Sequence, residues 1–326
     1  MSIRVGVVGP AAEDDFAANI LDGLAELGMP AVSLGQPVPS IPGRRATAFA
    51  DTVRRDPQLG PLMERSIVRR AKDHNVNLIV TVMSLTPDTV RALRSAGIRV
   101  ALWFPDHVAN LGALWMFNAP YDGLFFKEPA LVRRLNALLD LPVHYLPEAC
   151  NPRIHRPVGS AEAAGKVAVV GNLHPIRARL LERLASDGVP LAIYGPAHHS
   201  ALHASLRPFH AGRYVRGLDK SAVFCSAAAV LNNLHPAEME GVNCRLFEAT
   251  AAGGAVVCEH RPELNNFFDV GQQVLAFGEY GQLLAALRSL LDDHDMGRRL
   301  GTAASRRALA EHSYEQRLGA LLRLMP

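Results

Sequence analysis

Residues 240–254 read EGVNCRLFEATAAGG, which is typical of a tight turn that leads into a short helix and out through a second turn. Gly241 gives the first turn its freedom, and Asn243 has a side chain suited to an N-cap. The two glycines at the end of the stretch predict the helix stop. N–H groups at such a helix start attract an anion, and Arg245 adds a charge that forks onto phosphate oxygens.

Glu248 lies more than one turn inside this predicted helix. Its carboxylate is suited to accept hydrogen bonds from sugar hydroxyls beside the helix start. A phosphate at the helix start and hydroxyls beside it together indicate a nucleotide ligand.

The composition supports folded domains and excludes several classes of protein. The chain has 326 residues, of which 49% are hydrophobic and 20% charged, so two domains with sizeable cores are expected. The net charge is only +3, and the charged residues of both signs are interspersed along the chain. This pattern argues against nucleic acid as a partner. The sequence contains no run of about 20 apolar residues, so no transmembrane segment is predicted. Four cysteines without a C-x-x-C pair indicate reduced thiols and a cytoplasmic protein.

A second strand, turn and helix precede this stretch at residues 167–177, VAVVGNLHPIR. Gly171 permits close backbone approach, Asn172 follows it, and Arg177 lies near the start of the helix. A single arginine there is more often a solvated helix charge. Two anion sites in one domain nevertheless favour a diphosphate. Further on, a strand ends at Tyr194-Gly195, and residues 214–217 form an extended stretch with a turn.

The first half alternates strands and helices from residue 3 to residue 146, which predicts a doubly wound α/β domain with a parallel sheet. Its first strand ends at Gly9. A single glycine is no G-x-G-x-x-G fingerprint, and a tight strand-to-helix turn is the simpler interpretation. Residues 36–61 are expected to form a long loop. A composition shift near residues 150–165 predicts the domain boundary and hinge.

Asp106 and His107 follow the strand predicted at residues 100–104. In open α/β sheets the ligand lies beyond the carboxyl ends of the strands, so His107 is placed to act as a general base or as a donor to a sugar hydroxyl. The alternative is a loop-capping pair, in which Asp106 holds a turn and His107 is exposed.

Metal and hydrolase motifs carry little weight here. Asp293-His294-Asp295 imitates the D-x-D metal motif, but it lies in a polar turn between two amphipathic helices and is interpreted as a solvated charge cluster. No H-E-x-x-H motif, Cys/His metal spacing or G-x-S-x-G elbow occurs. No metal ligand is predicted.

An ordered set of motifs resembles the group 1 glycosyltransferases of the GT-B fold, especially their CgeB-like branch of spore-maturation and surface-sugar transferases. The set covers most of residues 100–326. It comprises Trp103-Phe104-x-Asp106, Val170-Gly171-Asn172 with Arg177, Tyr194-Gly195, Tyr214 to Gly217 with Lys220, Asn243-x-Arg245-x-Phe247-Glu248, and Gly253-Gly254.

The resemblance implies two Rossmann-like doubly wound domains that face a cleft. Residues 1–155 would bind the acceptor, with Gly9 on that side. Residues 156–310 would bind a nucleotide sugar, and residues 311–326 would form a helix that packs back toward the first domain.

The resemblance also assigns roles to residues. Glu248 would hold ribose hydroxyls, while the backbone near Tyr194, Gly195, Tyr214 and Gly217 would face the base. Glu240 stands eight residues before Glu248, as in the E-x7-E pair of related transferases, where the first glutamate contacts the donor sugar. The CgeB-like branch does not always keep that glutamate, and Glu238 lies close by. The diphosphate would be held by Gly171, Asn172, Arg177, Gly241, Asn243 and Arg245.

The expected function is therefore metal-independent transfer of a sugar, with a UDP-sugar favoured, to an acceptor hydroxyl. If the reaction inverts configuration, His107 or Asp106 is the expected base, and if it retains configuration they are substrate contacts. Two alternatives stay open: an epimerase on the same scaffold, and a non-catalytic protein that binds nucleotide sugars or a protein partner.

Overall fold

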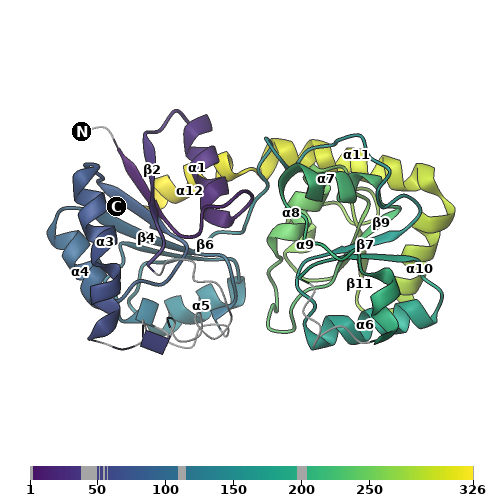
Figure 1. Ribbon diagram of the computed structural model, residues 1–326, viewed down its shortest axis with the longest axis horizontal. Helices are drawn as coiled ribbons and strands as arrows, with labels where there is room; N and C mark the ends of the chain where they lie inside the picture. Colours follow the sequence, from purple (N-terminus) through teal and green to yellow (C-terminus); the bar gives the residue numbers. More distant parts are fainter. Residues whose placement is uncertain are drawn as a thin grey trace. The chain divides into compact units, whose positions relative to one another are not determined.

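A computed structural model describes residues 3–37, 50, 52–53, 56, 58–108, 115–196 and 204–325. Most of the loop expected at residues 36–61 lies outside the described residues. The chain divides into two compact units: unit 1 contains Met1–Glu148 and Tyr314–Pro326, and unit 2 contains Ala149–Ser313 (Figure 1). The division falls after residue 148 rather than at 155, and the last helix begins at Tyr314.

Unit 1 is a three-layer α/β unit built on one parallel sheet with the strand order β2-β1-β3-β4-β5-β6. Its strands are β1 (Val5–Val8), β2 (Ala31–Gly35), β3 (Leu78–Thr81), β4 (Arg99–Phe104), β5 (Gly123–Phe126) and β6 (Val143–Tyr145). Its helices are α1 (Phe16–Glu26), α3 (Leu59–Asp73), α4 (Pro87–Ser95), the short 3-10 helix η2 (Trp115–Phe117), α5 (Pro129–Leu138) and α12 (Tyr314–Leu324).

The two faces of this sheet are covered by different helices. α3, α4 and α5 pack on one face over Ile79, Leu102 and Leu124. On the other face, α12 lies beside α1 (Figure 1). Tyr314 of α12 completes an aromatic cluster there, with ring centroids 5.5 Å from Phe16 and 5.9 Å from Trp103. The end of the chain is therefore part of the core of unit 1.

Unit 2 has a second parallel sheet, with the order β11-β10-β9-β7-β8. Its strands are β7 (Val167–Val170), β8 (Leu191–Tyr194), β9 (Ala229–Asn232), β10 (Val256–Glu259) and β11 (Leu275–Phe277). Its helices are α6 (Pro175–Ser186), the 3-10 helix η3 (Ala204–Phe209), α7 (Gly217–Ser226), α8 (Cys244–Ala251), α9 (Leu264–Phe267), α10 (Tyr280–Asp292) and α11 (His294–Glu311).

α6, η3 and α10 pack on one face of this second sheet, over a core that includes Val169, Ile193 and Leu231. α7 and α8 contact strands β7, β9 and β10, and α11 packs on α8. The prediction of an α/β protein with two doubly wound parallel sheets is confirmed.

Helix α8 is the one predicted from residues 240–254, and its two ends behave differently from each other. At the end, Gly253 has a φ of +83° and donates to Thr250 O, while Gly254 donates to Ala249 O, so the predicted stop is confirmed. At the start, Asn243 occupies the N-cap position, but its side chain makes no capping hydrogen bond. The expected side-chain cap was therefore wrong, and Gly241 has no positive φ.

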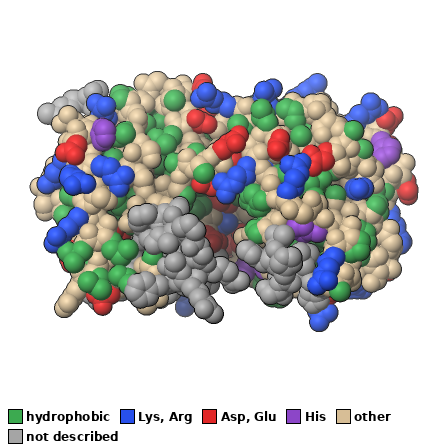
Figure 2. Space-filling view, in the orientation of Figure 1, with side chains coloured by type: hydrophobic (Ala, Val, Ile, Leu, Met, Phe, Trp, Pro, Cys, Tyr) green, Lys and Arg blue, Asp and Glu red, His purple; other side chains and the backbone are tan. Residues whose placement is uncertain are grey.

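The remaining surface features agree with a folded, thiol-containing protein. All four cysteines are free. Among the described residues, no helix is long and apolar enough to cross a membrane. Asp293 caps α11 by accepting from Met296 N at 2.8 Å. The first aspartate of the Asp293-His294-Asp295 sequence therefore has a structural role as a helix cap. Positive and negative side chains are interspersed on the face shown in Figure 2.

Candidate nucleotide site in unit 2

Arg177 lies at the point where the strand order of unit 2 reverses, between β7 and β9. His174 caps the start of α6 and Pro175 takes its first position, which puts Arg177 in the first turn. The guanidinium donates from Nη1 to Asn172 O at 2.7 Å, just after β7. It donates from Nε to Asn233 Oδ1 at 2.8 Å, just after β9. The interpretation of Arg177 as a solvated helix charge is wrong, because its side chain is buried.

Arg245, in the first turn of α8, reaches the same place. Its Nη1 donates to Asn232 Oδ1 at 3.1 Å, at the end of β9. Gly171 has a φ of +113°, and a Cβ placed there would lie 2.5 Å from Arg245 Nη2 and 3.6 Å from Arg177 Nη1. The two predicted anion sites are therefore one site, and both guanidiniums face the glycine turn after β7.

The turn itself is closed against the neighbouring strand. Gly171 N donates to Tyr194 O at 2.8 Å, and a Cβ on Gly195 would lie 2.4 Å from Gly171 O. A side chain at either position would push the turn away from the arginines. This close approach accounts for glycine at both positions.

The charges in this cluster are not balanced. Among the described residues, neither Arg177 nor Arg245 forms a salt bridge with a carboxylate. Burial first, and then the charge of Arg245, lower the pKa of Arg177 to about 8, and Glu238 opposes the shift. Burial, Arg177, His235 and Arg245 likewise lower the pKa of His174 to about 4. A bound anion would relieve this repulsion.

Glu238 is the carboxylate that acts on these cations. It is buried, and its Oε2 accepts from His235 N at 2.9 Å. Its charge raises the pKa of both Arg177 and His174. Glu240 is half-buried, and its carbonyl accepts from Glu263 N. Of the two glutamates before α8, the structure thus brings Glu238 into the electrostatics of the cluster.

Glu248 lies in the second turn of α8, where its buried carboxylate already has a cation. Lys220 Nζ on α7 is 2.9 Å from Glu248 Oε2, and the side chain of Lys220 is also buried. The fully buried His155 places Nε2 4.0 Å from Glu248 Oε1. His155 Nδ1 accepts from Asn151 N at 2.9 Å, so the proton lies on Nε2 and points toward the carboxylate. Lys220 and His155 therefore fix the orientation of Glu248.

Tyr214 is a predicted base-facing residue that interacts electrostatically with Glu248. Its ring is about half exposed, and the Arg216 guanidinium lies 5.3 Å from its centroid. Partial burial raises the pKa of Tyr214, and Lys220 and Glu248 both interact with its hydroxyl. Gly217, with a φ of +52°, begins α7. By contrast, Tyr194 is buried, and burial with a hydrogen bond to Glu162 raises its pKa.

Asn243 contributes an unsatisfied polar atom close to Arg245. Its Oδ1 is buried and has no hydrogen-bond partner in the described part of the chain. An amide oxygen only accepts, so in this orientation it suits a hydroxyl group. Rotated by 180°, the amide would present its NH₂ group to a phosphate oxygen.

The predicted residues of unit 1 have a simpler environment. Asp106 Oδ1 accepts from His107 N at 2.8 Å, just beyond β4, so the pair forms the expected capped turn; Asp106 is exposed and His107 is half-buried. A Cβ on Gly9 would lie 2.3 Å from Val82 Cγ2, which supports the tight-turn interpretation of that glycine. The catalytic roles of Asp106 and His107 and the acceptor-side role of Gly9 stay predictions.

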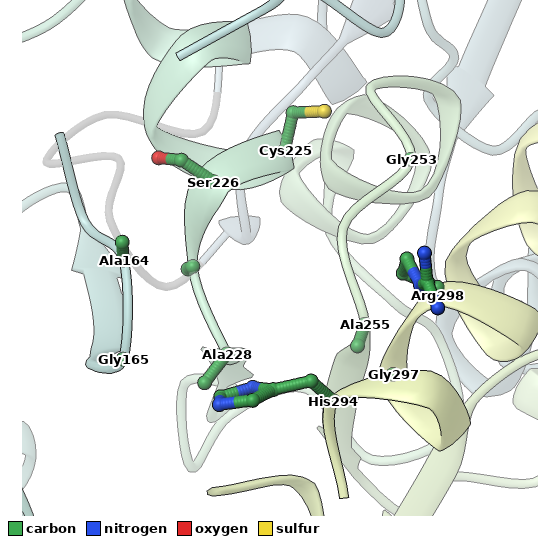
Figure 3. Close-up of a pocket in the computed structure, with 11 residues that line it drawn as sticks. Ala164, Gly165, Cys225, Ser226, Ala228, Gly253, Ala255, His294, Gly297 and Arg298 are labelled. Atoms are coloured by element: carbon green, nitrogen blue, oxygen red, sulfur yellow. The ribbon is translucent and has the colours of Figure 1, made fainter. Parts of the chain in front are cut away.

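A pocket of about 350 Å³ lies elsewhere in unit 2 and is lined mainly by glycine and alanine (Figure 3). Gly165, Ala228 and Ala255 line it, each just before a strand, with His294 and Arg298 from α11. It therefore lies at the amino edge of the sheet, opposite to the arginines.

Several residues of the cluster were not predicted as site residues. Asn232 and Asn233 form a polar pair at the end of a buried strand. Because ligands in such sheets bind beyond the strand ends where the strand order reverses, this pair was a visible signal of a site. His174 precedes a proline at a helix start, which is a capping signal. His155 gives no local signal, because its partner Glu248 is far away in the sequence.

Comparisons with known proteins agree with this architecture. Residues 177–323 match a family model described as "Glycosyl transferase-like". The comparison with curated proteins gives no match. Sucrose-phosphate synthase from Thermosynechococcus elongatus superposes with a TM-score of 0.69 at 14% identity, covering 98% of each chain.

Two further solved structures have the same fold. HepE from Anabaena, in complex with UDP, has a TM-score of 0.68 at 13% identity over 99% of this chain and 100% of HepE. AviGT4, a glycosyltransferase involved in avilamycin A biosynthesis, has a TM-score of 0.63 at 17% identity over 99% and 97%. The fold is GT-B. The GT-B fold expected from the sequence is thus confirmed.

Proposed function

We propose that this protein is a glycosyltransferase that takes a sugar from a nucleoside-diphosphate sugar, a UDP-sugar above all, and passes it to an acceptor hydroxyl. One observation carries the proposal. Two guanidiniums, from Arg177 and Arg245, meet at the glycine turn after β7 with no carboxylate in salt-bridge distance of either among the described residues. Such a pair, with Arg177 buried and Arg245 half-buried, is suited to a diphosphate.

The same pair would supply the main catalytic effect. When the bond between sugar and diphosphate breaks, negative charge develops on the leaving β-phosphate. Fixed donors aimed at that charge stabilise the transition state without reorganising. The backbone at Gly171 and Asn172 would approach the phosphates closely. Gly241 and Asn243 would border the phosphates at the start of α8.

Glu248 would hold the ribose, as the glycosyltransferase resemblance implies. Lys220 holds this carboxylate in place, and its remaining lone pairs would accept hydrogen bonds from hydroxyl donors. Tyr214, half exposed beside Glu248, would then border the base. HepE, which shares the fold, has been solved with UDP and with UDP-glucose, which supports a uridine donor here.

The acceptor chemistry is assigned to residues 106 and 107. If the reaction inverts configuration, His107 or Asp106 would take the proton of the acceptor hydroxyl. If it retains configuration, both would be substrate contacts. Glu240 would contact the donor sugar, with Glu238 as the nearer alternative. We propose further that the transferred sugar is a hexosyl group, that the protein belongs to the CgeB-like branch, and that it is cytoplasmic.

Calorimetry with UDP, GDP, dTDP and their sugars tests the donor site. We expect micromolar or tighter binding of one nucleotide, and release of that nucleotide from its sugar when acceptors are screened. Binding without release of nucleotide from any sugar would favour a non-catalytic binding protein. Conversion of one nucleotide sugar into its epimer would favour an epimerase.

Glu248→Ala is expected to weaken binding of that nucleotide by about 1–3 kcal/mol, because hydrogen bonds to a charged group are lost. Glu279→Ala, an exposed glutamate at the start of α10, is the matched control and should bind as the wild type does. Equal affinity of the Glu248 variant and the wild type would contradict the ribose assignment.

The transfer is expected to need no divalent metal, because the arginine pair already provides the positive charge. EDTA should therefore leave turnover intact. Loss of turnover on chelation, with recovery on addition of Mn²⁺, would overturn this part of the proposal.

A further inference from the structure

The outer face of α3 in unit 1 combines exposed leucines with exposed cations. Leu59 and Leu62 are 44% and 46% exposed in the first turn. Arg65, Arg69 and Lys72 continue along the exposed side over the next turns. The spacing of three or four residues keeps all five on one arc of the helix. Packing in the core does not account for these two leucines and three cations, because the opposite arc of α3 is the one that faces the core.

A groove of about 460 Å³ runs beside this arc, between α3 and α4. Its floor is mainly apolar. The two helices that form it are held together by the fully buried Glu64, whose Oε2 accepts from Thr86 N at 2.9 Å and from Thr86 Oγ1 at 2.8 Å. The groove is therefore a fixed feature of the unit. Its lining residues are Pro61, Arg65, Val68, Arg69, Lys72, Asp88, Thr89 and Ala92.

The charge of the groove is unbalanced toward the positive. Within the described chain, no carboxylate lies in salt-bridge distance of Arg65, Arg69 or Lys72. The acid on the opposite wall, Asp88, is paired with Arg91 at 2.6 Å. The surface therefore favours a partner that carries several negative charges.

We propose that the α3–α4 face binds the surface of a bilayer that contains anionic phospholipid. Cations reach lipid phosphates while leucines on the same arc enter the boundary of the acyl chains, which is the arrangement of an interfacial helix. The apolar floor of the groove extends the area available to lipid. An acidic peptide would match the charges but would leave the two exposed leucines unexplained. The proposal is independent of the sugar-transfer function.

The test is co-sedimentation of the full-length protein with vesicles. We expect binding to vesicles of phosphatidylcholine and phosphatidylglycerol at 3:1, and at least tenfold weaker binding to pure phosphatidylcholine. Raising the salt from about 0.05 to 0.5 M should release the protein, because screening weakens the contacts of exposed charges. The triple variant Arg65→Glu, Arg69→Glu, Lys72→Glu should lose at least tenfold in partitioning. Leu59→Ser with Leu62→Ser should lose several-fold at constant charge.

The matched control is Arg298→Glu, Arg299→Glu, Arg306→Glu, which makes the same change of net charge at exposed positions of α11. It should bind vesicles nearly as the wild type does. Circular dichroism and thermal unfolding of each variant separate loss of binding from loss of fold. Equal losses in the α3 and α11 variants, or equal binding to both kinds of vesicle, would overturn the proposal. Displacement from vesicles by polyglutamate, with no effect of the leucine substitutions, would overturn it in favour of an acidic peptide.

Discussion

The sheets of the two units share one strand order, 2-1-3-4-5 counted within each unit, with β6 added at one edge of unit 1. Ligands in such sheets bind where the order reverses, beyond the carboxyl ends of the strands. In unit 2 that point holds Arg177, which bridges the ends of β7 and β9. In unit 1 the corresponding point is filled by Val82 against Gly9. At the same topological position, unit 2 therefore holds polar and cationic side chains, whereas unit 1 holds a closed apolar contact.

The difference teaches how buried charge marks a site. Unit 1 also buries charge, because Lys127 and Glu148 follow β5 and β6 and lie 3.3 Å apart with both side chains almost fully buried. The two charges of this pair are opposite in sign. The arginines of unit 2 are held by neutral asparagines and repel each other. On the proposed function, a bound diphosphate would compensate the arginines of unit 2, whereas Lys127 and Glu148 are each other's counter-ion.

The largest effect on stability should come from breaking the pair of Lys127 and Glu148. Lys127→Met leaves the Glu148 carboxylate buried without its cation, which is expected to lower the free energy of unfolding by about 3–5 kcal/mol. Urea unfolding measures this. The double variant Lys127→Met, Glu148→Met should recover a large part of the loss. Equal stability of the single variant and the wild type would show that the pair does not balance buried charge.

Arg245→Met should have the opposite signature. Removing one of two guanidiniums that repel each other should leave the unfolding midpoint unchanged or slightly raised. Turnover should fall about 10²–10³-fold, which corresponds to about 2.7–4 kcal/mol of lost transition-state stabilisation. Steady-state kinetics and urea unfolding on the same preparation separate the two quantities. A variant that is strongly destabilised yet fully active would erase the distinction between the two units.

Much of the fold was predictable because alternating strands and helices leave a periodic pattern that depends on neighbouring residues. The helix stop at Gly253 and the start of α6 at Pro175 are local in the same way. The meeting of Arg177 with Arg245 is not local, since the two predicted anion sites become one only when β7 and β9 pair. The pairing of Glu248 with Lys220 and His155 is equally hidden, because it needs α7, α8 and the segment before β7 in their folded places.

The start of α8 shows a different limit. Asn243 has the right residue type and position for a cap, but its side-chain oxygen accepts no N–H from the helix. Propensity predicts the residue at such a position and not which atoms it bonds. A polar atom left unsatisfied at a helix start is more informative about a ligand than the cap would have been.

Gly171→Ala should separate backbone strain from the site. At its positive φ the added methyl costs about 1–3 kcal/mol, and it also meets Arg245 Nη2. Gly165→Ala is the matched control, because Gly165 also has a positive φ but nothing lies within 4 Å of its added Cβ. Both variants should lose stability in urea, while nucleotide affinity by calorimetry should fall only for Gly171→Ala. A similar loss of affinity in both would mean that strain, and not the arginine contact, controls binding.

The smallest effect concerns the proton on His174, whose pKa is lowered to about 4, mainly by burial and then by Arg177. The unfolded chain binds more protons than the folded chain between about pH 4 and the ordinary value of 6.5, so stability should rise with pH across this window and level off above it. The change should stay below about 1 kcal/mol, because the half-buried ring is screened. His174→Asn, which keeps an N-cap acceptor, should flatten this part of the profile of urea midpoint against pH.

A bound diphosphate would raise the pKa of His174, so nucleotide binding near pH 5.5 should take up a fraction of a proton in the wild type and less in the variant. Titrations in buffers of different ionisation enthalpy measure that difference, and equal proton uptake by both proteins would place the anion away from the arginine cluster.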